Sequence, residues 1–177
     1  MIQDTWQLGP FENGRYNPTR VIVKSVVSFG PIFEFDPEYG QEDPIPVFLE
    51  DAESRGQEFL SAFKDFLGNN QGEFEFDFPD AWLPKIKVID TKELHEYFSR
   101  ENGGSMNGWE DFYFDHPGAI GMVTISRPGI SMEGTTAFLY LGHQSGIRAG
   151  GGYIRVLKKS NGVWRVLDEI FGGYWVS

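Results

Sequence analysis

The 177-residue chain contains no cysteine, and this absence excludes several classes of protein at once. The chain cannot be a disulfide-stapled scaffold, a thiol-dependent enzyme, an iron–sulfur protein or a protein with cysteine-ligated zinc. Folding at this length buries about 70% of the surface of the unfolded chain, which is enough for a hydrophobic core without staples. We therefore expect one domain over residues 1–177.

Basic side chains are also scarce. The chain has 15 lysines and arginines against 26 acidic residues, which gives a formal net charge of −11. Nucleic-acid binding depends on clustered lysine and arginine side chains that displace counterions from phosphates. We therefore expect no nucleic-acid partner, and the negative charge favours solubility and repels anionic lipid surfaces.

Long apolar runs are missing as well. No stretch approaches the roughly 18 apolar residues that a membrane-spanning helix requires, and the first residues form neither a basic leader nor an apolar segment. We expect a soluble protein without a membrane span, cytoplasmic by default. An exported mature form that has lost its leader would show the same pattern.

The first part of the chain predicts an arm, a strand, an acidic loop and a helix. Three breaker pairs of proline, glycine and asparagine fall within residues 1–19, which indicates an irregular N-terminal arm. β-branched residues predict a strand over residues 20–29, and residues 34–43 form an acidic loop without lysine or arginine. Apolar side chains at helical spacing predict one helix over residues 51–67.

The middle of the chain predicts one more strand and two short helices. Aromatic and acidic residues alternate over residues 73–78, which is typical of a strand, and its carboxylates are too far apart for a metal site. Asp90 lies three residues before Glu93, the spacing of a capping box, and predicts a short helix after Asp90. Asn107 begins the same spacing and predicts a second helix over residues 108–116.

Alternation with a period of two returns over residues 119–177 and predicts an antiparallel meander. Its connections are too short for parallel crossovers. Asn161-Gly162 is a strong signal for a tight hairpin turn, and the three glycines at 150–152 predict a turn or a bulge. The four expected strands span residues 119–127, 134–143, 151–159 and 163–171.

Helices followed by antiparallel strands indicate an α+β fold, with the helices packed on one face of a curved antiparallel sheet. Over residues 51–177 this order of elements resembles the cystatin-like and nuclear-transport-factor-two-like cone folds. The resemblance implies a concave sheet face. Those folds host isomerases, dehydratases and binding modules, so the fold alone does not select a function.

The candidate catalytic residues are a histidine and two aspartates. His143 ends the second meander strand, where an imidazole can act as a general base at the mouth of a pocket. Asp111 or Asp115 would orient that imidazole, or take the proton itself, if the helix over residues 108–116 crosses this end of the sheet. Arg148 would hold an anionic group. We expect no metal site and no cofactor.

Aromatic residues make up 16% of the chain, which is enough to line an apolar pocket as well as a core. Side chains with an apolar body and a polar tip suit a ligand site on the concave sheet face. The expected ligand-binding residues are Tyr140, His143, Arg148, Tyr153 and Trp164.

The carboxy-terminal segment carries a recognisable pattern. It consists of FLYLGHQSG at residues 138–146, GGGY at 150–153, GVWRV at 162–166 and WVS at 175–177. This pattern resembles a family of uncharacterised bacterial proteins, some of them lipoprotein-like, over about the last 60 residues. Relatives often have a Gly-Gly-Leu-Cys-Gly-like stretch at positions 145–150, where this chain has no cysteine. The resemblance implies a hairpin with a glycine-rich turn and a paired final strand, and no activity.

Three functions remain open from the sequence. The first is a binding module that takes a small molecule or a protein partner on its concave sheet face. The second is an enzyme of the ketosteroid-isomerase or dehydratase type, with a histidine or aspartate as general base. The third is an acidic interaction or immunity-type protein whose acidic loop meets a basic partner. The lack of a complete catalytic set favours the first.

Overall fold

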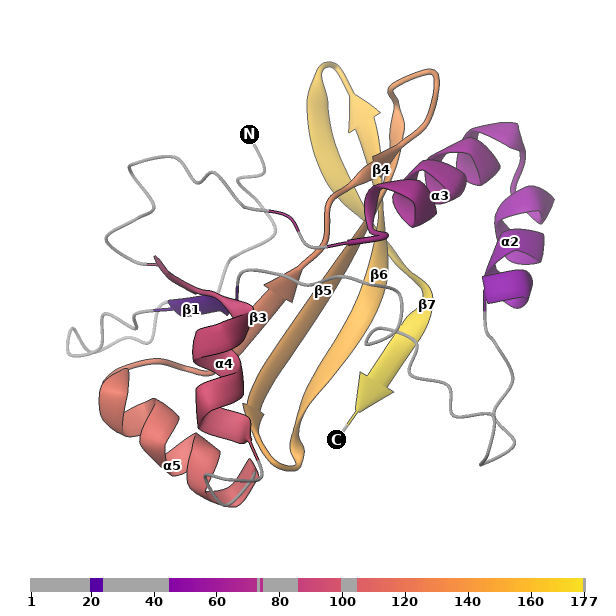
Figure 1. Cartoon of the computed structure of the whole chain (residues 1–177). Coiled ribbons are helices and arrows are strands. Elements are labelled where there is room, and N and C mark those ends of the chain that lie inside the picture. Colours follow the sequence, from indigo (N-terminus) through magenta and orange to yellow (C-terminus); the bar gives the residue numbers. More distant parts are fainter. Residues whose placement is uncertain (1–19, 24–44, 73, 75–85, 100–104, 177) are drawn as a thin grey trace.

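The computed structural model describes residues 20–23, 45–72, 74, 86–99 and 105–176 (Figure 1). The predicted arm over 1–19, the acidic loop and the strand over 73–78, apart from Phe74, lie outside these residues. The described helices are α2 (Ile45–Ser54), α3 (Gln57–Asn69), α4 (Thr91–Phe98) and α5 (Ser105–Asp115). The described strands are β1 (Arg20–Val23), β2 (Ile86–Ile89), β3 (Met122–Ile125), β4 (Gly129–Ile130), β5 (Thr136–Gly146), β6 (Ala149–Ser160) and β7 (Val163–Val176).

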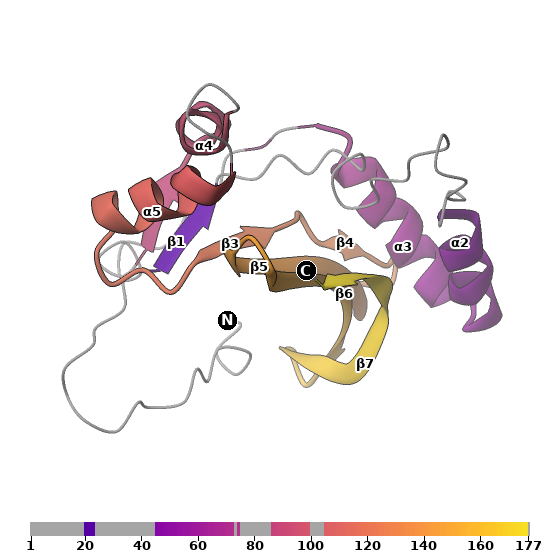
Figure 2. The ribbon, with the colours of Figure 1, turned by 90° about the horizontal axis from the view of Figure 1, so that it is seen from below.

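The α+β class predicted from the sequence is confirmed. The strands form one sheet in the order β2-β1-β3-β5-β6-β7, and the short β4 pairs with β5 beside β3. Figure 2 shows the helices along one side of β3, β5 and β6, with the sheet curling round at β7. The two long hairpins β5–β6 and β6–β7 form the body of this sheet.

The predicted antiparallel meander is confirmed in β3, β5, β6 and β7, each of which pairs with the next in antiparallel orientation. The turn between β6 and β7 is the one that its dipeptide predicts. Asn161 and Gly162 have φ values of 51° and 79°, the left-handed conformation that a two-residue hairpin of this type needs at both positions. The short strand β4 was not predicted.

The three glycines at 150–152 were expected to form a turn or a bulge. They do not form the turn, so the first of these alternatives is wrong. Gly150, Gly151 and Gly152 lie inside β6, and Gly151 pairs with His143 on one side and Val176 on the other. The turn consists of residues 147 and 148, because pairing in the hairpin continues to Gly146 and Ala149. A shift in the register of β6 with β7 follows Gly152, which agrees with the expected bulge.

The other half of the sheet is parallel, and this pairing was not predicted, although β1 lies within the strand expected over residues 20–29 and β3 within the one expected over residues 119–127. β1 lies between β2 and β3 and runs parallel to both, with Arg20 opposite Ile86 and Val21 opposite Met122. β2 occupies a segment for which the sequence indicated no strand. Its four residues are too few to show a clear alternation, and parallel partners lie far apart in the chain.

The single helix predicted over residues 51–67 is wrong, because this region forms two helices. Gly56 has a φ of 110° between α2 and α3, a conformation that side-chain-bearing residues rarely adopt and that interrupts the helix. α2 also begins earlier than expected, at Ile45. Pro46 follows at once, in the first turn, where the missing N–H of proline removes no helical hydrogen bond.

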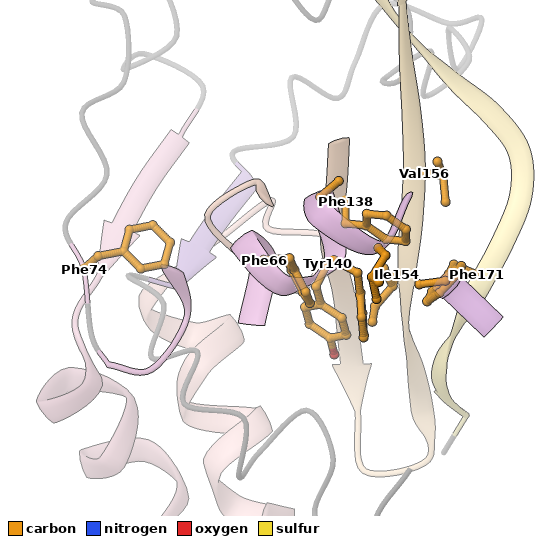
Figure 3. Close-up of a cluster of buried hydrophobic side chains, with 11 residues drawn as sticks. Phe66, Phe74, Phe138, Tyr140, Ile154, Val156 and Phe171 are labelled. Atoms are coloured by element: carbon orange, nitrogen blue, oxygen red, sulfur yellow. The ribbon is translucent and has the colours of Figure 1, made fainter. Parts of the chain in front are cut away.

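The larger hydrophobic core lies between α2–α3 and the strands β5, β6 and β7. Phe63 and Phe66 of α3 are fully buried against Phe138 of β5 and Phe171 of β7. Figure 3 shows Phe66 of α3 on the side of the helix that faces the strands, near Tyr140 and Ile154. The rings of Phe63 and Phe138 meet edge to face, with centroids 5.3 Å apart, a favoured aromatic geometry.

A second core lies between α4–α5 and the β1–β3 side of the sheet. It contains Ile89 of β2, Met122 of β3, and Trp109 and Phe112 of α5, with partly buried residues of α4 packed against them. The described part of the chain therefore has one sheet and two helical pairs, each pair with its own core. The second core borders the pocket described below.

Candidate functional site

A pocket of about 390 Å³ lies between α4, α5 and the end of the β5–β6 hairpin. Both helices, the sheet and the hairpin turn contribute to its wall. Most of the lining is apolar, and two residues are polar. The lining residues are Leu94, His95, Phe98, Trp109, Met122, Gln144 and Ile147.

The sheet forms the floor of the pocket. Met122 of β3 lies directly opposite Gln144 of β5 in the antiparallel ladder, so both side chains project from the same face. This is the face that carries Phe138 and Tyr140, because alternate residues of a strand share a face. The pocket is therefore on the helix-covered side of the sheet.

The helix α4 forms one wall and begins at a strong cap. Asp90 Oδ1 accepts a hydrogen bond of 2.7 Å from the backbone N–H of Glu93, which confirms the predicted N-cap. From this start, Leu94 and Phe98 fall one turn apart and face the pocket with His95. The cap thereby fixes which residues of α4 line the site.

The helix α5 contributes Trp109, which is 6% exposed. Its ring meets that of Phe98 edge to face, with centroids 5.2 Å apart and planes at 61°. The capping signal expected at Asn107 is wrong, because α5 already begins at Ser105 and Asn107 lies within it. The predicted end of this helix, near Asp115, agrees with the structure.

The two helices can approach closely because Gly108 has no side chain. A Cβ at this position would overlap the backbone oxygen of Tyr97 and come within 2.7 Å of Phe98 Cδ1. Real Cβ contacts are not this short, so only glycine fits without a shift. Gly108 thus sets the spacing of the two helical walls.

A hydrogen bond ties α5 to the hairpin end. The hydroxyl of Tyr113 donates to the backbone carbonyl of Ser145 at 2.9 Å, and burial raises the pKa of Tyr113. Ser145 stands between Gln144 on the floor and the turn that carries Ile147. The bond therefore positions the hairpin end against α5.

A polar cluster lies beside the pocket, where α4 meets the end of α5. The hydroxyl of Tyr97 donates to Asp115 Oδ2 at 2.9 Å and lies 3.3 Å from His116 Nε2. Burial, followed by the hydrogen bond to Asp115, raises the pKa of Tyr97 to about 12. Tyr97 is therefore a hydroxyl donor at neutral pH that links the two helices.

His116 is the most buried member of this cluster, at 7% exposed. Burial first, and then the charge of Lys87, lower its pKa below the ordinary value of 6.5. Its Nε2 lies 4.0 Å from Glu93 Oε1, but an ion pair needs a protonated ring. At neutral pH the ring is uncharged, and Lys87 is the cation that pairs with Glu93, at 2.6 Å.

Three polar groups of the pocket have no hydrogen-bond partner within the part of the chain that the structure describes. They are the carboxamide of half-buried Gln144, the imidazole of exposed His95 and the indole N–H of Trp109. Buried polar groups in proteins are nearly always hydrogen-bonded. These groups are therefore available to a bound molecule or to water.

The structure does not bring the expected catalytic residues together. His143 is exposed on the sheet face opposite the pocket, and its Nε2 lies 3.2 Å from the carbonyl oxygen of Ile120. Asp111 is exposed on α5, while Asp115 accepts the hydrogen bond from Tyr97. Helix α5 does pack near this end of the sheet, as the expectation for these acids required, through Tyr113 and the hairpin.

The expected ligand-binding residues are also distributed over different parts of the sheet. Tyr140 is buried in the core beneath α3, whereas Tyr153 lies on the opposite face, where the Arg155 guanidinium sits 4.4 Å from its ring centroid. Trp164 lies at the start of β7, next to Lys159. Arg148 is exposed in the hairpin turn, one residue from the pocket-lining Ile147.

None of the seven lining residues was expected in a site from the sequence, and four of them, His95, Met122, Gln144 and Ile147, were not expected in a core either. One signal was present for Gln144. In the alternation of β5 it occupies the same face as Phe138, where a polar side chain interrupts a buried row. The other three become neighbours only through the packing of α4 on the sheet.

In the parts of the chain described here, no group of three or more histidine, aspartate or glutamate side chains is arranged to hold a metal ion. Over the same residues, no helix combines the length and the apolar character needed to cross a bilayer. Comparisons of the chain with protein-family models, with curated proteins and with solved structures give no match.

Proposed function

We propose that this protein is a binding module for a small molecule, which it takes into the pocket between α4, α5 and the β5–β6 hairpin. The observation that carries the proposal is the lining of that pocket: five apolar side chains with a few polar groups that have no partner among the described residues. Known small-molecule sites combine an apolar concavity with few, well-placed polar groups.

The volume supports a small ligand. At about 390 Å³, the pocket falls within the range of roughly 300–1,000 Å³ that is usual for such sites. Its floor is a paired strand ladder and its walls are capped or tethered helices. A preformed site of this kind loses little entropy of its own when a ligand binds.

The lining supports binding more than proton abstraction. Its described part contains one imidazole and no carboxylate, and two acids of the neighbouring polar cluster, Glu93 and Asp115, are engaged by Lys87 and Tyr97. Acid–base catalysis usually depends on two titratable groups in one cavity whose pKa values are shifted apart, and the described lining residues include no such pair. The proposal therefore keeps the binding function expected from the sequence but moves its site to the helix-covered face of the sheet.

The test is a fragment screen by ligand-observed NMR, with two matched variants. Ile147 lines the pocket and is 47% exposed, whereas Ile130 lies on β4 away from the pocket and is 41% exposed. Ile147→Trp should fill the pocket mouth and weaken binding of the hits at least tenfold, while Ile130→Trp should leave them unchanged. Hits that bind Ile147→Trp as well as the parent protein, or a screen without hits, would refute the proposal.

A further inference from the structure

We infer that the pocket takes an uncharged molecule with a flat apolar ring system and a carboxamide-like group, that is, a carbonyl acceptor next to an N–H donor. This inference rests on the proposed function and assigns the chemical class of its ligand. It follows from the charge, the unpaired polar groups and the ring arrangement of the lining residues.

The charge of the lining disfavours an ionised ligand. Among the lining residues that the structure describes, none is an aspartate, glutamate, lysine or arginine. A carboxylate or ammonium group on the ligand would lose its hydration against Leu94, Phe98 and Met122 without a fixed counter-charge, which is costly. The net charge of −11 further disfavours an anion. A neutral molecule avoids both penalties.

The carboxamide of Gln144 selects the polar part of the ligand. It lies on the pocket floor, is half buried, and has no partner among the residues that the structure describes. A carboxamide offers two N–H donors and a carbonyl acceptor. Another amide can satisfy the N–H donor and the carbonyl acceptor at once, through a pair of parallel hydrogen bonds. A ketone would satisfy the donors alone.

The indole N–H of Trp109 adds a second requirement. The residue is 6% exposed and lines the pocket, and its N–H has no acceptor within the described residues. Because indole N–H is a donor only, its partner must be an acceptor, such as a carbonyl oxygen. An amide carbonyl has two lone pairs and can accept from more than one donor.

The ring arrangement selects the apolar part. Phe98 and Trp109 meet at 61°, so together they offer a face and an edge to a third ring, the two geometries that aromatic groups prefer. Met122 adds a polarizable thioether from the floor, which makes favourable contacts with ring edges. A flat ring fits this wall better than a flexible chain, because it loses less conformational freedom on binding.

The experiment compares three probes with one ring system: 2-naphthamide, 2-acetonaphthone and 2-naphthoate. Dissociation constants are measured by NMR titration on the full chain. We expect the amide to bind about tenfold more tightly than the ketone, since one hydrogen bond is worth up to about a factor of ten. The naphthoate should bind more weakly than both.

The variant Gln144→Met keeps the length of the side chain and removes its hydrogen bonds. It should weaken the amide, which loses two hydrogen bonds, about tenfold more than the ketone, which loses one, so that the two probes then bind equally. Trp109→Phe should weaken amide and ketone alike, and its folding is checked by the dispersion of its NMR spectrum. Gln144→Met carries the test if Trp109→Phe does not fold.

The outcomes separate the ligand class from the proposed function. Amide preference that disappears in Gln144→Met supports the inference. Equal binding of all three probes, or tighter binding of naphthoate, overturns the ligand class while the pocket remains a binding site. Failure of these probes beside fragment hits sensitive to Ile147→Trp also overturns only the class. Failure of every compound overturns the proposed function.

Discussion

Replacing Gly108 with alanine sets two physical effects of opposite sign against each other. Alanine is a better helix former than glycine by roughly 0.5–1 kcal/mol, so in an open helix the change stabilises the fold. At Gly108, however, the added methyl group would overlap the backbone oxygen of Tyr97 and crowd the ring of Phe98. The structure therefore predicts that the gain is reversed.

The size of the loss follows from what would have to move. A clash with the far end of a flexible side chain is relieved cheaply, but here one partner is backbone. Relief requires α4 and α5 to separate, and overpacking of this kind costs about 1–3 kcal/mol. After subtraction of the helix-propensity gain, we expect Gly108→Ala to lower the free energy of unfolding by about 1 kcal/mol, and by up to about 2.5 kcal/mol if the helices cannot adjust.

The matched control is Gly68→Ala in α3. Gly68 is exposed, and a Cβ there would meet no heavy atom within 4 Å, so we expect this variant to be more stable by up to about 1 kcal/mol. Urea unfolding followed by circular dichroism gives both values at a shared m-value. If Gly108→Ala proves as stable as Gly68→Ala, the close approach of the two helices described above is wrong.

Three further predictions concern polar groups. Asn70 is fully buried and bonds to the backbone of Arg127 in both directions, so Asn70→Ala should cost about 2 kcal/mol in urea unfolding, whereas Asn69→Ala should cost little. Hydrogen bonding, first to Lys158, lowers the pKa of Glu58 from 4.5 to about 2. Its stabilisation is therefore present above pH 4.5 and is lost as the pH falls towards 2, and Glu58→Gln should flatten acid unfolding in that window. For buried His116, with its pKa below 6.5, stability should fall as the pH drops through 6.5, and His116→Gln should remove that slope; an unchanged slope would contradict the burial argument.

The antiparallel half of the sheet could be predicted because its signals are local. Alternation marks β5, β6 and β7 over 11 to 14 residues each, and Asn161-Gly162 fixes one turn. Of the three strands in the parallel half, which have four residues each, β1 and β3 lie within predicted strands, but β2 and the parallel pairing were not predicted. Strands that short carry little pattern, and their partners are set by tertiary packing.

The candidate site was predictable only in its parts. Asp90 predicts the start of α4, and from this start the helical period places Leu94 and Phe98 on one apolar face. The local sequence does not indicate whether this face packs against the end of the β5–β6 hairpin or against its middle. That choice depends on the parallel strands, which carry α4 and α5 to the β3 side of the β5–β6 hairpin. The expected residues on the concave face were chosen without this information.

The position of β1 between β2 and β3 sets an order of events when the unfolded chain collapses. The long hairpins close through turns of two residues, which is fast. β1 must pair with Met122, about a hundred residues along the chain, and closing so large a loop costs more conformational entropy and is slower. The helical walls of the pocket therefore assemble after the hairpins. The pocket does not exist before this late step, so a compound that binds there stabilises only the folded state. It should therefore slow unfolding in proportion to its occupancy and leave the refolding rate unchanged.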